Sequence, residues 1–101
     1  MPETFDATLI TIVAEHVLES RLVHDLQQCG ARGWTVTEAR GQGPKARRVS
    51  DLEGGNIRIE AIVTTAVAED MLTVLVRDYF PHYAVTAWLS AARVARADRL
   101  T

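Results

Sequence analysis

The sequence has very little cysteine, with Cys29 the only one among 101 residues. A single cysteine excludes an intrachain disulfide and a cysteine-rich zinc site. Cys29 falls within a helical pattern of apolar residues, so we expect its thiol to be buried and unreactive.

The chain also lacks an excess of positive charge and any long apolar run. Its net charge of −2 excludes a protein that holds nucleic acid through an overall positive field. Most aromatic residues sit at core-like positions, so we expect no nucleic acid partner. No run approaches the ~20 apolar residues that cross a membrane, so we expect no membrane insertion. Residues 1–4 lack the features of a signal peptide, and we expect a cytoplasmic protein.

Residue patterns typical of catalysis or metal binding are also missing. No two of the three histidines have metal-ligand spacing, and no serine has a neighbouring base or lies in a nucleophile-elbow pattern. The residues concerned are His16, His24, His82, Ser20, Ser50 and Ser90. We therefore expect neither an enzyme nor a metal site.

The patterns that are present predict one domain over residues 1–101. Strands are expected at 5–14, 34–39, 56–63 and 83–93, and helices at 16–30 and 67–80. Gly30 is a natural helix stop, Thr64-Thr65 offers a hydroxyl N-cap, and Pro81 ends the second helix. The order β-α-β-β-α-β predicts the α+β ferredoxin-like sandwich, with two helices on one face of a four-stranded antiparallel sheet.

Two helices can cover only one face of such a sheet. The first, third and fourth strands nevertheless carry large apolar residues at both alternating positions, as with Ile10 and Ile12 against Leu9 and Val13. An apolar face left bare is expected to be buried between subunits, so we predict an oligomer.

A loop from Arg40 to Gly55 joins the second and third strands and is longer than an ordinary hairpin loop. Gly41 and Gly43 would let backbone N–H groups approach an anion closely, and Arg47 and Arg48 could add charge-assisted hydrogen bonds. The same residues are equally consistent with a flexible loop carrying two solvated arginines. Spacing alone leaves both interpretations open.

The segment Gly33-Trp34-Thr35-Val36-Thr37-Glu38-Ala39-Arg40-Gly41-Gln42-Gly43 resembles the second-strand signature of the PII signal-transduction proteins. The segment Ala92-Arg93-Val94-Ala95-Arg96 resembles the end of the last strand in that family, and the order of elements fits over essentially the whole chain. The resemblance implies a homotrimer that binds adenine nucleotides in clefts between neighbours. It also implies that residues 41–55 are the effector-facing T-loop, followed after the last strand by a polar tail over 94–101.

The resemblance implies a site residue by residue. Thr35 matches the threonine that contacts adenine, Gly41 and Gly43 match the glycines beside the phosphates, and Arg96 matches a phosphate-binding arginine. The full set of nucleotide-binding candidates is Gly33, Thr35, Thr37, Gly41, Gln42, Gly43, Arg47, Arg48 and Arg96.

Two departures from the family pattern concern the phosphates. Asp98 stands where the family has a second arginine, and Asp78-Tyr79-Phe80-Pro81-His82-Tyr83 replaces a loop rich in glycine and lysine. With two cations missing, the resemblance implies AMP, ADP or a cyclic nucleotide rather than ATP, and Arg47 and Arg48 are candidates to supply the lost charge.

With these departures the sequence is similar to the branch of the family that is linked to inorganic carbon. The resemblance implies bicarbonate as a further candidate ligand. No cofactor is expected. The candidate protein partners are a bicarbonate transporter or a carboxysome-related protein. The main alternative is another ferredoxin-like regulator, an amino-acid- or metal-responsive trimer. An acyl-phosphate hydrolase on this fold comes third, with Asn56 as the only asparagine to position water.

Overall fold

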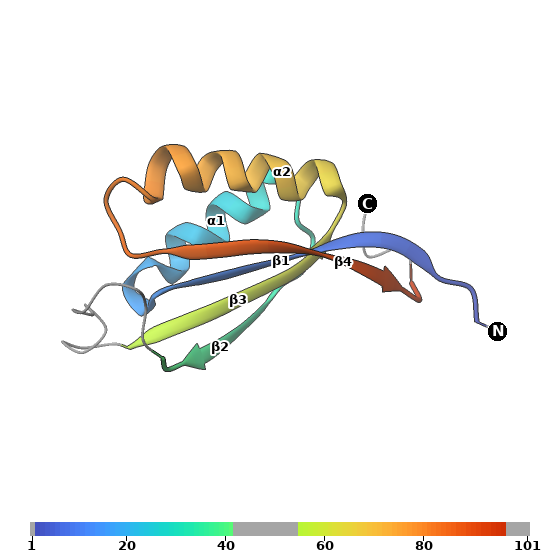
Figure 1. Ribbon diagram of the computed structural model, residues 1–101, viewed down its shortest axis with the longest axis horizontal. Helices are drawn as coiled ribbons and strands as arrows, with labels where there is room; N and C mark the ends of the chain where they lie inside the picture. The colour runs from blue at the N-terminus through green and yellow to red at the C-terminus, as the bar shows by residue number, and fades with distance from the viewer. Residues whose placement is uncertain (1, 42–54, 97–101) are drawn as a thin grey trace.

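The computed structural model describes residues 2–41 and 55–96. Figure 1 shows a four-stranded sheet with both α-helices on one face. The elements in chain order are β1 (Phe5–Glu15), a 3-10 turn (His16–Leu18), α1 (Glu19–Cys29), β2 (Thr35–Ala39), β3 (Asn56–Val63), α2 (Thr65–Val74), a π-helical segment (Leu75–Tyr79) and β4 (Thr86–Val94). The predicted order and the ferredoxin-like fold class are confirmed.

The strands are ordered β2-β3-β1-β4, and every neighbouring pair is antiparallel. β2 and β3, which the long loop after Arg40 connects, are therefore paired with each other. β1 pairs with β4 from Phe5 onward but meets β3 only from Thr8. The β1–β4 pair consequently extends beyond the end of β3 as a two-stranded arm (Figure 1).

The core lies between the sheet and the helices. Alternate residues of β1 point into it, and Ile10 and Ile12 are almost completely buried there beside Ile57 and Ile59 of β3. The helices contribute the buried side chains Leu18, Leu22, Leu26, Ala68, Met71, Leu75 and Tyr79. The helical spacing of these apolar residues is what holds both helices on this face.

The predicted helix ends are correct at two capping residues. Gly30 takes the left-handed conformation (φ 119°) at the end of α1, and Thr64 Oγ1 accepts a hydrogen bond from the Val67 N–H at 3.2 Å. Cys29 is only partly buried rather than buried, with its Sγ 3.9 Å from Met71 Sδ. Burial, followed by Asp70 and Asp25, raises the pKa of this thiol and keeps it protonated.

The end of the second helix differs from the prediction because it becomes π-helical. The Phe80 N–H bonds to the Leu75 carbonyl at 2.8 Å, so this turn contains one residue more than an α-helical turn. Tyr79 is buried with Leu75, four residues earlier, while Val76 is exposed. β4 also begins later than predicted, at Thr86.

The sheet face away from the helices, here called the open face, carries Leu9, Thr11, Val13, Ile62 and Trp88. Trp88 is 42% exposed, and Phe5 and Phe80 are also exposed, so the expectation that most aromatics lie in the core is wrong for these three. Beside Trp88 in the register, the Thr11 side chain is fully buried, and its Oγ1 has no hydrogen-bond partner among the described residues.

None of the described helices is both long enough and apolar enough to cross a membrane.

Candidate functional site

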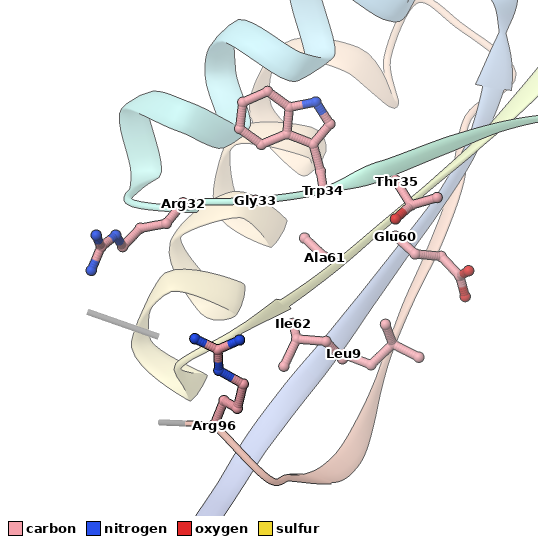
Figure 2. A pocket seen from close by; sticks show the side chains of 9 residues that line it. All are labelled: Leu9, Arg32, Gly33, Trp34, Thr35, Glu60, Ala61, Ile62 and Arg96. Atoms are coloured by element: carbon pink, nitrogen blue, oxygen red, sulfur yellow. The ribbon is translucent and has the colours of Figure 1, made fainter. Parts of the chain in front are cut away.

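A pocket of about 740 Å³ opens where the turn after α1, the end of β3 and the end of β4 meet. Figure 2 shows the side chains that line it. These residues are Leu9, Arg32, Gly33, Trp34, Thr35, Glu60, Ala61, Ile62 and Arg96. Its volume is in the range of small-molecule sites, and it combines an apolar wall with a few polar groups.

Thr35 and Glu60 form the hydrogen-bonding end of the pocket. They are directly paired across β2 and β3, and both lie on the open face. The Glu60 carboxylate also accepts a hydrogen bond from Arg58 Nη2 at 3.2 Å. A threonine hydroxyl can donate and accept while a carboxylate only accepts, so this end suits a polar ligand that carries donor groups.

Arg96 reaches the pocket from the end of the β1–β4 arm, just after the last residue of β4. The arm is fastened by Arg93, whose Nε and Nη2 donate to Thr4 Oγ1 at 3.1 and 2.9 Å. Figure 2 places Arg96 away from Thr35 and Glu60, and Leu9 and Ile62 lie between. The pocket is therefore polarised, with a carboxylate at one end and a guanidinium at the other.

The structure brings together three of the predicted site residues, since Gly33, Thr35 and Arg96 all line this pocket. Thr37 lies on the same face of β2, opposite Arg58, but is not part of the lining. Gly41 follows the far end of β2. Gln42, Gly43, Arg47 and Arg48 lie outside the described residues, as does Asp98.

Arg32 and Glu60 are lining residues that the sequence analysis missed. Arg32 directly precedes the Gly33 motif, and that adjacency was the available signal. Glu60 alternates with apolar residues in β3, which assigns it to the open face but cannot show that Thr35 lies beside it.

Thr35 and Gly41 lie at opposite ends of β2. Six residues of extended chain span about 20 Å, which is longer than a nucleoside monophosphate. A Cβ added to Gly41 would meet no atom within 4 Å. The described fold therefore has no steric need for glycine at this position.

The segment that replaces the family's Gly- and Lys-rich loop is held against α1. Arg21 Nη1 donates to the Tyr83 hydroxyl at 3.1 Å, and its guanidinium lies 4.8 Å from the centre of the Tyr79 ring. The Tyr79 hydroxyl donates to Asp25 Oδ2 at 2.5 Å and so links this segment to α1 a second time. Burial and this carboxylate together raise the pKa of Tyr79 well above its usual value.

Among residues 2–41 and 55–96, no three histidine, cysteine, aspartate or glutamate side chains cluster as metal ligands. Within that part of the chain, the pocket offers a carboxylate, a hydroxyl and guanidinium groups. This chemistry is suited to binding a polar anion.

The sequence matches the family model described as "Nitrogen regulatory protein P-II" over residues 7–99. No curated protein matches it significantly. Among solved structures, a PII-like signalling protein from Thermus thermophilus is 43% identical, with a TM-score of 0.85 and coverage of 98% of this chain and 99% of that one.

More distant structures share the fold. CPII from Thiomonas intermedia, bound to ADP and bicarbonate, is 15% identical with a TM-score of 0.85 and full coverage of both chains. The Bacillus subtilis GlnK–ATP complex is 14% identical with a TM-score of 0.61, covering 89% of this chain and 83% of that one. With the family model spanning nearly all of its length, this chain belongs to the P-II family and is a PII-like regulatory protein.

Proposed function

We propose that this chain is a non-enzymatic sensor that binds an adenine nucleotide in the pocket around Thr35 and Arg96. The observation that carries the proposal is that one pocket collects Gly33, Thr35 and Arg96 from two distant parts of the sequence. Thr35 would contact the base, and Arg96 would bind phosphate through charge-assisted hydrogen bonds.

The second half of the site would come from a neighbouring copy. Thr35 and Gly41 of one chain are too far apart to contact the same nucleoside monophosphate. The open face, with Trp88 and Leu9, supplies an apolar surface for a homotrimer. In that assembly Gly41, with Gln42 and Gly43, would approach the ligand held at the neighbour's Thr35, and Thr37 would lie nearby. Arg47 and Arg48 would add charge from the loop.

We propose AMP and ADP as the preferred ligands, ahead of ATP. Tyr79 and Tyr83 contact Arg21 and Asp25 of α1. The segment 78–83 therefore packs against α1 and supplies no lysine or arginine to bind a terminal phosphate. Asp98 would add a negative charge where the family has an arginine. Nucleotide binding would order the loop and change the surface that it presents to a protein partner.

The ligands named for CPII, which are ADP, AMP and bicarbonate, define the panel to test. We propose that bicarbonate modulates nucleotide binding here and that the signal concerns inorganic carbon, with a bicarbonate transporter or a carboxysome-related protein as partner. The corresponding location would be the cytoplasm.

Calorimetric titration of AMP, ADP, ATP and cyclic AMP, each with and without bicarbonate, tests the proposal. We expect AMP and ADP to bind more tightly than ATP. If bicarbonate is coupled, it must change nucleotide affinity by the same factor by which nucleotide changes bicarbonate affinity. Thermal protection by amino acids or divalent metals without any nucleotide binding would instead support another ferredoxin-like regulator. Turnover of acyl phosphates would contradict the non-enzymatic assignment.

A further inference from the structure

The cationic end of the pocket contains two arginines that are distant in sequence. Arg32 belongs to the turn between α1 and β2, and Arg96 follows β4. Both line the pocket, and both lie at the end away from Glu60 (Figure 2). Two arginines from different elements therefore line one site.

The turn that carries Arg32 is firmly anchored. The Gly30 N–H bonds to the Gln27 carbonyl at 3.0 Å, and the Ala31 N–H bonds to the Leu26 carbonyl at 3.1 Å. Ala31 is also buried, at 6% exposure. These two hydrogen bonds and the burial of Ala31 fix the backbone that precedes Arg32, so ligand binding would require no rearrangement of this turn.

The opposite end of the pocket disfavours an anion. Glu60 is paired with Arg58 at 3.2 Å, and its carboxylate oxygens can only accept hydrogen bonds, from a ribose hydroxyl or a base amino group but not from an unprotonated phosphate. The charge distribution therefore selects one ligand orientation, with the phosphates toward the two arginines.

We propose that Arg32 is a second phosphate-binding residue that acts with Arg96 and fixes the direction in which the nucleotide lies. This inference rests on the nucleotide site proposed above. Guanidinium groups bind phosphate oxygens in bidentate fashion, so two of them from separate elements hold a phosphate in one geometry. Arg32 thereby supplies a cation that the sequence motifs do not contain.

The test compares Arg32→Ala and Arg32→Lys with Arg77→Ala by calorimetric titration with AMP, ADP and adenosine. Arg77 is a matched control because it is an exposed arginine on the helical layer that pairs with Asp78. We expect Arg32→Ala to weaken AMP and ADP binding by roughly 10-fold or more and to leave adenosine binding as in the control. Arg32→Lys should recover only part of the loss, because an ammonium group cannot form the bidentate contact.

The outcomes separate the two proposals. If the wild type binds nucleotide, and Arg32→Ala binds AMP and ADP as tightly as Arg77→Ala does, the role of Arg32 is overturned. The proposed nucleotide site would still stand. An equal loss of adenosine and AMP binding in Arg32→Ala would also overturn it, because the residue would then support the pocket rather than the phosphate. If the wild type binds no adenine nucleotide, the proposed function fails and the role of Arg32 fails with it.

Discussion

The Tyr79 hydroxyl donates a hydrogen bond to Asp25 Oδ2 at 2.5 Å, which ties the π-helical segment to α1. The Tyr79 side chain is buried, and Asp25 is the charged group that accepts its hydrogen bond. We expect Tyr79→Phe to lower the free energy of unfolding by about 1–2 kcal/mol, measured by urea denaturation at neutral pH. An unchanged midpoint would show that the hydrogen bond contributes nothing to stability.

The same hydrogen bond predicts a dependence on alkaline pH. Burial and then the Asp25 carboxylate raise the pKa of Tyr79; Asp78 acts in the same direction, and the Arg21 guanidinium opposes them. An unfolded chain releases the tyrosine proton near pH 10, whereas the folded chain retains it. The stabilisation is therefore complete below about pH 10 and is lost as the pH rises further. The stability difference between wild type and Tyr79→Phe should shrink above that pH, and a constant difference up to pH 11 would contradict this account.

Replacing the buried Thr11 should stabilise the protein. Its Oγ1 is buried without a hydrogen-bond partner among the described residues, so Thr11→Val should raise the free energy of unfolding by up to about 1 kcal/mol. Thr8→Val is the matched control, since Thr8 Oγ1 does have a partner, Thr65 Oγ1 at 2.9 Å. The free energy of unfolding of Thr8→Val should instead fall by about 1 kcal/mol. Equal effects of the two substitutions in parallel denaturation curves would contradict the assignment.

Replacing Gly30 should destabilise the protein through its backbone conformation. Its φ of 119° is unfavourable for a side chain, and an added Cβ would lie 3.1 Å from Val67 Cγ2. We expect Gly30→Ala to cost about 1–2 kcal/mol in thermal or denaturant unfolding. At Gly33 a Cβ would meet nothing within 4 Å, so Gly33→Ala should change stability by less than about 0.5 kcal/mol. A Gly30→Ala protein as stable as Gly33→Ala would refute the geometry.

Replacing Trp88 on the open face should change the oligomeric state. A charge in place of the large apolar side chain on the open face would be buried in the proposed trimer, so Trp88→Glu should release monomers. The control Val76→Glu changes an exposed apolar residue on the helical layer instead. Light scattering should report three times the 11.1 kDa chain mass for wild type and control, and the single mass for Trp88→Glu. A trimeric Trp88→Glu protein would exclude the open face as the interface.

The sequence predicted most of the fold because apolar periodicity changes cleanly between its elements. The π-helical hydrogen bonding of Leu75–Tyr79 could not be predicted in this way, because the buried residues Met71, Leu75 and Tyr79 keep an ordinary helical spacing. The start of β4 was placed too early, at Tyr83, because the contact of that residue with Arg21 of α1 spans 62 positions in sequence.

The candidate site was only partly predictable for a similar reason. Motif resemblance identified Thr35 and Arg96, which carry a recognisable local pattern. It could not identify Glu60, because its proximity to Thr35 depends on the register between β2 and β3. For Arg32 the only signal was its position directly before the Gly33 motif, and only the folded turn brings it into the pocket that Arg96 also lines.

The most direct test of the central claim is calorimetric titration of ADP into wild type, Arg96→Ala and the exposed control Arg77→Ala. The account predicts saturable ADP binding by wild type and control, and affinity lower by roughly 10-fold or more in Arg96→Ala. Equal affinity in all three proteins, or no ADP binding by the wild type, would contradict it.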